Sequence, residues 1–169
     1  MNLRVTPFSR TYLFAERERE SMSKRFFVLT DLEGVVGVDS WRQTKHDVEG
    51  FDADAEAAAM DELAREVNAC IEGIREVHPD AEIDVLDGHG PGGLRAEDLR
   101  GGEYVRMDDT YVFEPFQTTE YDAMLYVGQH AMAGTAFAPL RHTLSSDAYE
   151  YYKLNGTFIG EFAGGAIAA

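Results

Sequence analysis

A long helical pattern between two short apolar runs is the feature that most constrains this fold. Apolar side chains recur every three or four residues, the spacing of one helix face, at Ala57, Met60, Leu63, Val67, Ile71, Ile74 and Val77. Asp52 or Asp54 can cap the start of this helix, and Pro79 ends it. The flanking runs, residues 26–29 and 83–86, are typical of buried strands. A strand, a helix and a strand in succession predict two parallel strands with the helix packed on their sheet.

Later segments extend this pattern. Four of them have the short, β-rich character of strands: residues 104–107, 123–127, 142–146 and 151–159. The last of these turns at Asn155-Gly156, and the Gly/Ala-rich residues 161–169 can open a helix. Neither a linker nor a repeat interrupts residues 24–169. We therefore predict one α/β domain, with a largely parallel, Rossmann-like open sheet and flanking helices.

Residues 1–23 differ from this domain. They carry a charged run, residues 17–20, and their one apolar stretch, residues 12–15, is too short for a signal-peptide core. We expect an N-terminal extension that is disordered, and we hypothesise that Met22 is the natural start.

Charge and cysteine content limit the partners of the chain. There are 15 Lys and Arg residues against 31 Asp and Glu residues, a net charge of -16. An acidic surface repels phosphate backbones and anionic lipids, so neither nucleic acid nor membrane is expected as a partner. No apolar run approaches the ~18 residues of a membrane span, and we expect a cytoplasmic protein. The single cysteine, Cys70, excludes a disulfide framework and indicates core packing.

Carboxylates and histidines follow one predicted strand after another. Asp31 and Glu33 come after the first strand, His89 after the second, His130 after the fourth, and Glu161 after the last. Ligands of open α/β sheets bind at the carboxyl ends of the strands, so these five side chains should converge on one edge. Asp31 and Glu33 would leave the same face of an extended backbone and repel each other unless a cation lies between them. Oxygen and imidazole ligands suit zinc, and also manganese or cobalt.

Each of these residues also has an ordinary structural interpretation. An aspartate before glycines, such as Asp31, often caps a turn, and a histidine in a glycine-rich loop, such as His89, is often solvated or structural. The loop at residues 88–93 has the glycine content of a phosphate cradle, but it lacks the P-loop lysine and the GxGxxG spacing.

Six motifs follow one another from about residue 25 to the C-terminus: VLTDLEGVVG from Val28, EVNACIEG from Glu66, LDGHG from Leu86, VGQHA from Val127, RHTLS from Arg141 and NGTFIGE from Asn155. In this order they resemble the D-aminopeptidase family of dinuclear zinc peptidases, peptidase family M55. The resemblance implies a fold similar to the α/β arrangement above.

The resemblance also implies a site with two zinc ions per chain. Asp31 matches the carboxylate that bridges the two ions. Glu33 and His89 match the other ligands of one ion, and His130 and Glu161 match those of the second. A zinc-dependent aminopeptidase that hydrolyses short peptides, with a D-amino acid at their N-terminus, is then expected. Two alternatives stay open, namely another dinuclear metallohydrolase such as a phosphoesterase, and an inactive metal-binding or interaction remnant.

His142 matches a histidine that lines the same cleft without being a metal ligand. We expect it at the start of a strand, where its imidazole could hydrogen-bond an oxyanion or protonate the leaving amine. A hydrogen-bonded structural histidine is the alternative.

The chain departs from the family in two respects. Full family members continue well beyond Glu161 and assemble into decameric rings, so we expect that the C-terminal part of the family fold is missing here. A homo-oligomer is implied for the full-length chain. In addition, Gln129 stands where an aromatic residue is common in the family, which could change the wall of the cleft.

Overall fold

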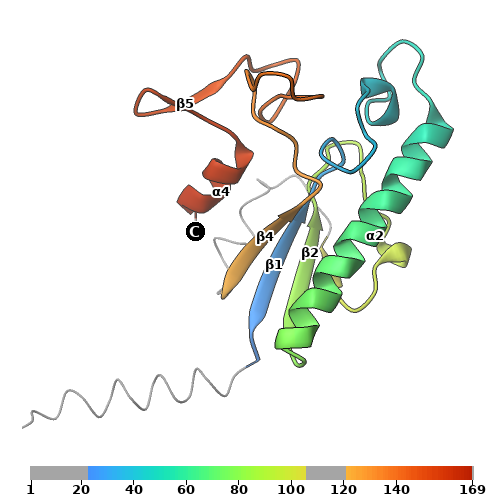
Figure 1. The fold of residues 1–169 in the computed structure, drawn as a ribbon, viewed down its shortest axis with the longest axis vertical. Coiled ribbons are helices and arrows are strands. Elements are labelled where there is room, and N and C mark those ends of the chain that lie inside the picture. Colours follow the sequence, from blue (N-terminus) through green and yellow to red (C-terminus); the bar gives the residue numbers. More distant parts are fainter. Residues whose placement is uncertain (1–22, 106–120, 169) are drawn as a thin grey trace, which may run out of the picture.

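Four parallel strands form the central sheet. The computed structural model describes residues 23–105 and 121–168. The strands lie in the order β3-β2-β1-β4, and their bounds are β1 Arg25–Thr30, β2 Glu82–Asp87, β3 Glu103–Val105 and β4 Ala123–Val127. Strand β1 pairs in parallel with both β2 and β4, so the carboxyl ends of these three strands meet at one edge (Figure 1). The predicted α/β fold with a largely parallel sheet is confirmed.

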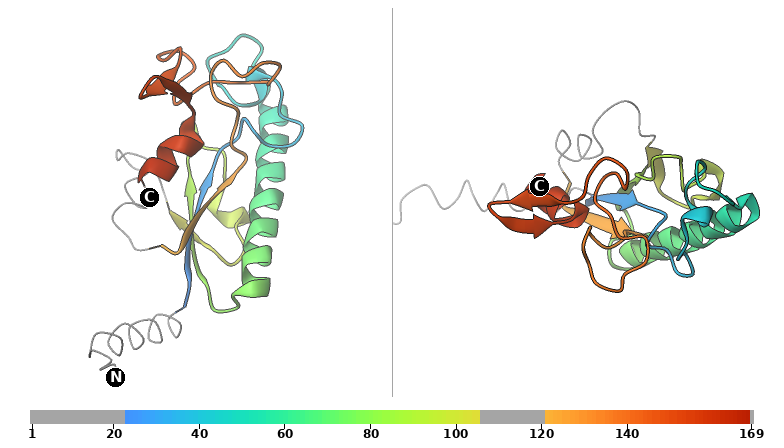
Figure 2. Two further views of the ribbon diagram at one scale, coloured as in Figure 1. Left: turned by 60° about the vertical axis from the view of Figure 1, so that its left-hand side comes forward. Right: turned by 90° about the horizontal axis from the view of Figure 1, so that it is seen from above.

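Helix α2 (Ala53–Val77) connects β1 to β2 and covers one face of the sheet (Figures 1 and 2). The Asp52 side chain caps the helix by accepting hydrogen bonds from the backbone N–H groups of Asp54 and Ala55. Its apolar face packs into a cluster of buried side chains with Val28 and Val85 of the sheet. Because side chains alternate along a strand, the neighbours of Val28 point to the other face.

The other face of the sheet holds a second, smaller cluster. Its fully buried members are Phe27, Leu29 and Leu86. Helix α4 (Glu161–Ala168) lies beside this face, where the rings of Phe162 and Tyr126 are 5.1 Å apart (Figure 2). A hairpin of β5 (Tyr152–Leu154) and β6 (Thr157–Ile159) precedes α4 and turns at residues 155–156, as predicted.

One predicted strand is wrong. Residues 142–146 are irregular, and Leu144 has φ +63°, a left-handed conformation that interrupts an extended strand. The backbone N–H of Leu144 donates instead to the Glu161 carboxylate, with 2.6 Å between the two atoms. His142 therefore lies in a loop and not at the start of a strand.

Two further predictions fall partly outside the described residues. Of the predicted N-terminal extension only Ser23 lies within the described residues, and the strand predicted for 104–107 is described as far as Val105. Two short 3-10 helices, η1 (Trp41–Gln43) and η2 (Ala96–Asp98), occupy the loops. Among the described residues, no helix has the length and apolar content needed to cross a membrane.

The loops after β1 and β4 pack closely because of a glycine. Gly128 has φ +72°, and its carbonyl oxygen accepts a hydrogen bond of 2.7 Å from the Gly34 N–H. A Cβ atom at Gly128 would lie 2.0 Å from the carbonyl oxygen of Asp31. Only glycine therefore allows the two loops to approach this closely.

Two Gly→Ala changes should shift the free energy of unfolding in opposite directions. Gly73 lies in the interior of α2 with open space around it, so Gly73→Ala should stabilise the protein by roughly 0.5–1 kcal/mol. Gly128→Ala should destabilise it by more than about 2 kcal/mol, because both the backbone conformation and the contact with Asp31 become unfavourable. Urea denaturation measures both changes, and a Gly128→Ala protein as stable as the parent would contradict the described loop packing.

Candidate metal centre

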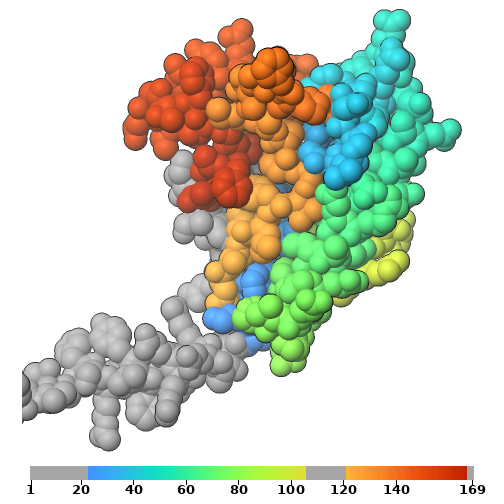
Figure 3. Space-filling model, viewed as in Figure 1, coloured from blue at the N-terminus to red at the C-terminus, as the bar shows by residue number. Residues whose placement is uncertain are grey.

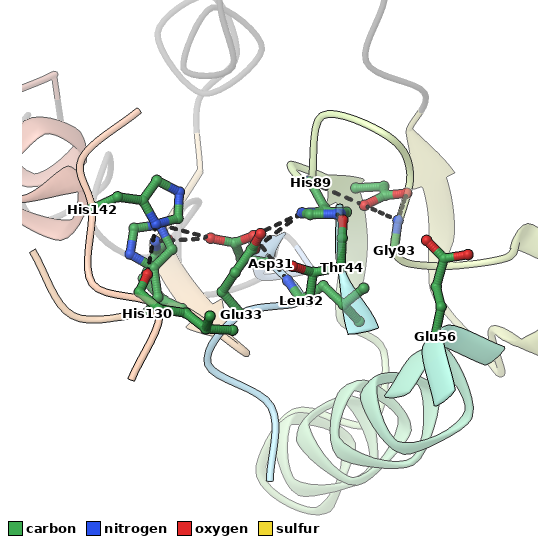
Figure 4. A network of polar contacts seen from close by, with 12 residues as sticks. Asp31, Leu32, Glu33, Thr44, Glu56, His89, Gly93, His130 and His142 are labelled. Atoms are coloured by element: carbon green, nitrogen blue, oxygen red, sulfur yellow. Dashed lines mark hydrogen bonds and ion pairs between the residues drawn. The ribbon is translucent and has the colours of Figure 1, made fainter. Parts of the chain in front are cut away.

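The structure brings all six site residues of the sequence prediction to the carboxyl edge of the sheet. Figure 4 labels all of them except Glu161. Asp31 and Glu33 lie in the loop after β1, and His89 lies in the loop after β2. His130 follows β4, and Glu161 begins α4. His142 joins them from the loop that had been predicted as a strand. The six side chains form two groups of three.

The first group consists of Asp31, Glu33 and His89, all buried. The His89 Nδ1 atom lies 3.0 Å from Glu33 Oε2 and 3.5 Å from Asp31 Oδ1. Glu33 Oε2 is buried and lacks a hydrogen bond of good geometry within the described structure. A buried carboxylate oxygen without such a partner is available to a cation.

The second group consists of His130, His142 and Glu161. The His130 Nε2 atom lies 3.1 Å from Glu161 Oε1 and 3.3 Å from the second carboxylate oxygen of Asp31, Oδ2. Nε2 of His130 is also buried without a hydrogen bond of good geometry in the described part of the chain. Asp31 thus directs one oxygen toward each group.

His142 lies closer to the ligand atoms than the sequence suggested. Its ring stacks on that of His130, with 3.6 Å between centroids and 14° between planes, and the edge of Trp41 contacts it from the other side. His142 is near enough to His130 and Glu161 to ligate the same ion. The prediction that it stays outside the ligand set is not tested by this geometry.

Backbone carbonyls orient the three imidazoles. His89 Nε2 lies 2.9 Å from the carbonyl oxygen of Thr44, His130 Nδ1 lies 2.9 Å from that of Ala131, and His142 Nδ1 lies 2.8 Å from that of Leu140. A carbonyl can only accept, so in each ring this nitrogen carries the proton. The other nitrogen is the one that could ligate an ion, once it carries no proton. Metal-binding histidines are commonly held in this way.

A family model described as D-aminopeptidase, peptidase family M55, matches residues 24–169. The chain belongs to this family. We found no significant match among curated proteins or among solved structures. Members of a peptidase family are hydrolases that act on peptides, and the two groups of possible ligands in this M55 chain agree with a metal-dependent member.

Other side chains hold the ligands of this M55 chain in place, and the sequence had not assigned them that role. The buried Asp87 carboxylate accepts hydrogen bonds from the backbone N–H groups of His89, Gly93 and Leu94, which shapes the loop that carries His89. Its position as a strand-end carboxylate before glycines was the available signal. The Gln129 amide donates to Asp31 Oδ2 and Glu161 Oε2, at 3.1 Å each, and so connects the two groups.

The histidines neutralise the buried carboxylates of the metal-free chain. Burial lowers the pKa of His89, but the close carboxylates of Asp31 and Glu33 outweigh it and raise the value to about 10. Burial also lowers the pKa of His130, but the Glu161 carboxylate outweighs it and raises the value to about 9. Burial raises the pKa of the Asp31 carboxyl. Burial also opposes ionisation of Glu33, but the neighbouring His89 and Asp31 side chains outweigh it and lower its pKa.

An inner cavity of about 200 Å³ opens at these groups. Its walls include the six site residues together with Trp41, Lys45 and Asp147. Burial, followed by the charge of His130, lowers the pKa of His142, so this imidazole is neutral near pH 7. The cavity therefore combines carboxylates, imidazoles and one neutral histidine that can donate or accept a proton.

The metal-free protein should lose stability as pH rises from about 6.5 toward about 10. His89 and His130 keep their protons in the folded state up to about pH 10 and 9, whereas an unfolded histidine releases its proton near 6.5. Their stabilising contribution is complete below the unfolded value and is lost as pH passes through the folded values. Urea midpoints of the chelator-treated protein across this window measure the effect.

His89→Gln should flatten this pH dependence, because the variant cannot hold the proton. His46→Gln is the matched control, since His46 is half exposed and pairs with Glu56 away from the site. A parent midpoint that stays constant or rises over the window would contradict the charge assignment.

Proposed function

We propose that this chain is a dinuclear zinc aminopeptidase that removes a D-amino acid from the N-terminus of short peptides. Membership in the M55 family supports peptide hydrolysis. The observation that carries the metal proposal is the position of Asp31, whose Oδ1 faces His89 and whose Oδ2 faces His130. A carboxylate with one oxygen toward each ligand group is suited to bridge two ions.

The donor set fits zinc. The five assigned ligands are Asp31, Glu33, His89, His130 and Glu161, which offer oxygen and imidazole nitrogen only. Zinc accepts both ligand types, and manganese or cobalt could replace it. When bound, two such ions activate a water molecule and polarise the scissile carbonyl. Because metal binding needs neutral imidazoles, His89 and His130 must release their protons as the ions bind.

The side chains around the cavity supply the other functions of an aminopeptidase. The free amino terminus of the substrate would bind an ion or an acidic side chain of the cavity, which favours cleavage at the N-terminal residue. His142, neutral and stacked on His130, can hydrogen-bond the developing oxyanion or protonate the leaving amine. Asp31, Glu33 and His89 are buried, so bulk solvent does not reach the cavity from their side.

Phosphoester hydrolysis is supported less well than peptide hydrolysis. Enzymes that bind phosphate usually place arginine or lysine side chains on its oxygens. Lys45 is the one lysine or arginine among the described residues that line the inner cavity, and Asp147 already pairs with it.

The zinc-loaded protein should hydrolyse D-Ala-p-nitroanilide, and Asp31→Ala should abolish both hydrolysis and zinc retention. Loss of the bridging carboxylate removes a ligand from both ions, so dialysed Asp31→Ala should lose both of them. His130→Ala should lose mainly one ion. Plasma mass spectrometry of the metal content, on the samples used for the assay, measures these losses.

Asp39→Ala provides the control for this experiment, because Asp39 lies outside the cavity walls and should keep its metal and activity. L-Ala-p-nitroanilide and p-nitrophenyl phosphate complete the substrate panel. Full zinc retention by Asp31→Ala would overturn the bridging assignment. Faster turnover of p-nitrophenyl phosphate than of either anilide would overturn the peptidase assignment.

His142→Ala should reduce kcat by roughly 10²–10⁴-fold while the fold and the zinc content stay unchanged. This is the usual scale for loss of an acid–base or oxyanion-stabilising group. His46→Ala removes an imidazole outside the cavity and should leave kcat unchanged. Near-normal kcat in His142→Ala would show a structural histidine, and loss of zinc would make His142 a metal ligand.

A further inference from the structure

A second cavity adjoins the inner cavity of the candidate metal centre. This outer cavity has a volume of about 530 Å³. Both cavities share five lining residues: Trp41, Lys45, His142, Ser146 and Asp147. The inner cavity is smaller than the ~300–1,000 Å³ that small-molecule sites usually offer. A peptide whose first residue lies at the ligand groups can extend into the outer cavity through the residues that the two cavities share.

Lys45 lies at the boundary between these cavities, where two loops meet. It comes from the loop after η1, and its ammonium group donates to Ser146 Oγ at 3.3 Å and pairs with the Asp147 carboxylate of the segment before β5. The two loops also meet at the molecular surface (Figure 3). The Lys45 ammonium lies 5.9 Å from the ring centroid of Trp41, which in turn contacts His142. A continuous row of contacts thus links Lys45 to the candidate metal centre.

The proposed function fixes which end of the peptide lies where. Asp31, Glu33 and Glu161 would be occupied as metal ligands, and an aminopeptidase places the amino end of its substrate at that centre, so the carboxyl end points toward the outer cavity. Lys45 is the sole lysine or arginine lining the inner cavity within the described ranges, and Arg141 adds a cation to the outer one. The outer cavity also holds the carboxylates of Asp147 and Glu150, and Lys45 is the one of its two cations that borders both cavities.

The partner of Lys45 can be replaced by a ligand. The Asp147 side chain is 71% exposed, so water can solvate its carboxylate after the ion pair opens. Exposed ion pairs of this kind contribute little free energy, whereas a carboxylate held inside the cavity forms a charge-assisted hydrogen bond. Exchange of Asp147 for a substrate carboxylate is therefore favourable.

We propose that Lys45 binds the C-terminal carboxylate of the peptide substrate and thereby selects short peptides with a free carboxyl end. This inference rests on the proposed function, since the ligand groups define where the N-terminal residue lies. A longer peptide would carry its carboxylate past Lys45, and an amidated peptide would offer no negative charge. Lys45 is thus a specificity-determining residue that acts on binding.

The test compares D-Ala-D-Ala with D-alanyl-D-alaninamide as substrates of the zinc-loaded protein. The parent should prefer the free acid, and Lys45→Met should lower kcat/KM for the acid by roughly 10–100-fold, mainly through KM. Hydrolysis of the amide should change less than about twofold. Lys45→Arg should keep most of the preference because it retains the charge.

Two variants separate this role from alternatives. Lys24→Met removes the same charge from an exposed ion pair with Asp122, far along the chain, and should leave the preference unchanged. Asp147→Asn removes the closer of the two ion pairs of Lys45, leaves the one with Asp47 at 4.0 Å, and should maintain or increase kcat/KM for the acid. If Asp147→Asn loses as much activity as Lys45→Met, the ion pair is structural and the proposal is overturned. Equal losses on acid and amide in Lys45→Met would overturn it as well.

A binding measurement keeps this test independent of hydrolysis. N-acetyl-D-alanine has the carboxylate but no free amine, and N-acetyl-D-alaninamide has neither. In NMR titrations of the zinc-loaded protein, the acid should bind more tightly than the amide, and Lys45→Met should remove the difference. If no peptide is hydrolysed but this difference is found, the proposed function fails and the carboxylate site stands. Equal binding of both compounds by the parent would overturn the carboxylate site.

Discussion

Buried carboxylates that require a cation are the constraint on which the rest of this structure depends. Asp31 and Glu33 lie side by side at the end of the central strand, both nearly inaccessible to water. Burial of a carboxylate is unfavourable without a counter-charge, and in the metal-free chain protonated His89 and His130 provide it. In the proposed function, the same geometry would hold metal ions once those protons leave. The carboxylates at the sheet edge would then have a counter-charge in either state, from protons or from metal.

Much of the fold follows from local sequence patterns. The unit β1–α2–β2 and the hairpin at residues 155–156 were predicted because their signals, helical periodicity and an Asn-Gly turn, are local. Ligands bind at the carboxyl ends of parallel strands, and this rule was enough to predict that the residues after β1, β2 and β4 lie together. The strand predicted at residues 142–146 was wrong, because an alternation of apolar and polar residues does not reveal the positive φ of Leu144.

Contacts between distant loops could not be predicted. The stacking of His142 on His130, the amide of Gln129 between two carboxylates, and the pairing of Lys45 with Asp147 each join segments that only the folded sheet brings together. Sequence position gives the residue types, but the direction of each side chain depends on backbone hydrogen bonds within irregular loops. The candidate ligands could therefore be predicted from the sequence, whereas the residues that orient them could not.

The two ligand groups differ in their order of synthesis. Asp31, Glu33 and His89 all belong to the β1–α2–β2 unit, whereas the second group is incomplete until Glu161 has been made. Chains fold from the N-terminus as they leave the ribosome. In the proposed dinuclear site, the ligands of one ion would thus be complete in the chain before those of the other. The order in which the two positions could be filled would then follow the order of the sequence.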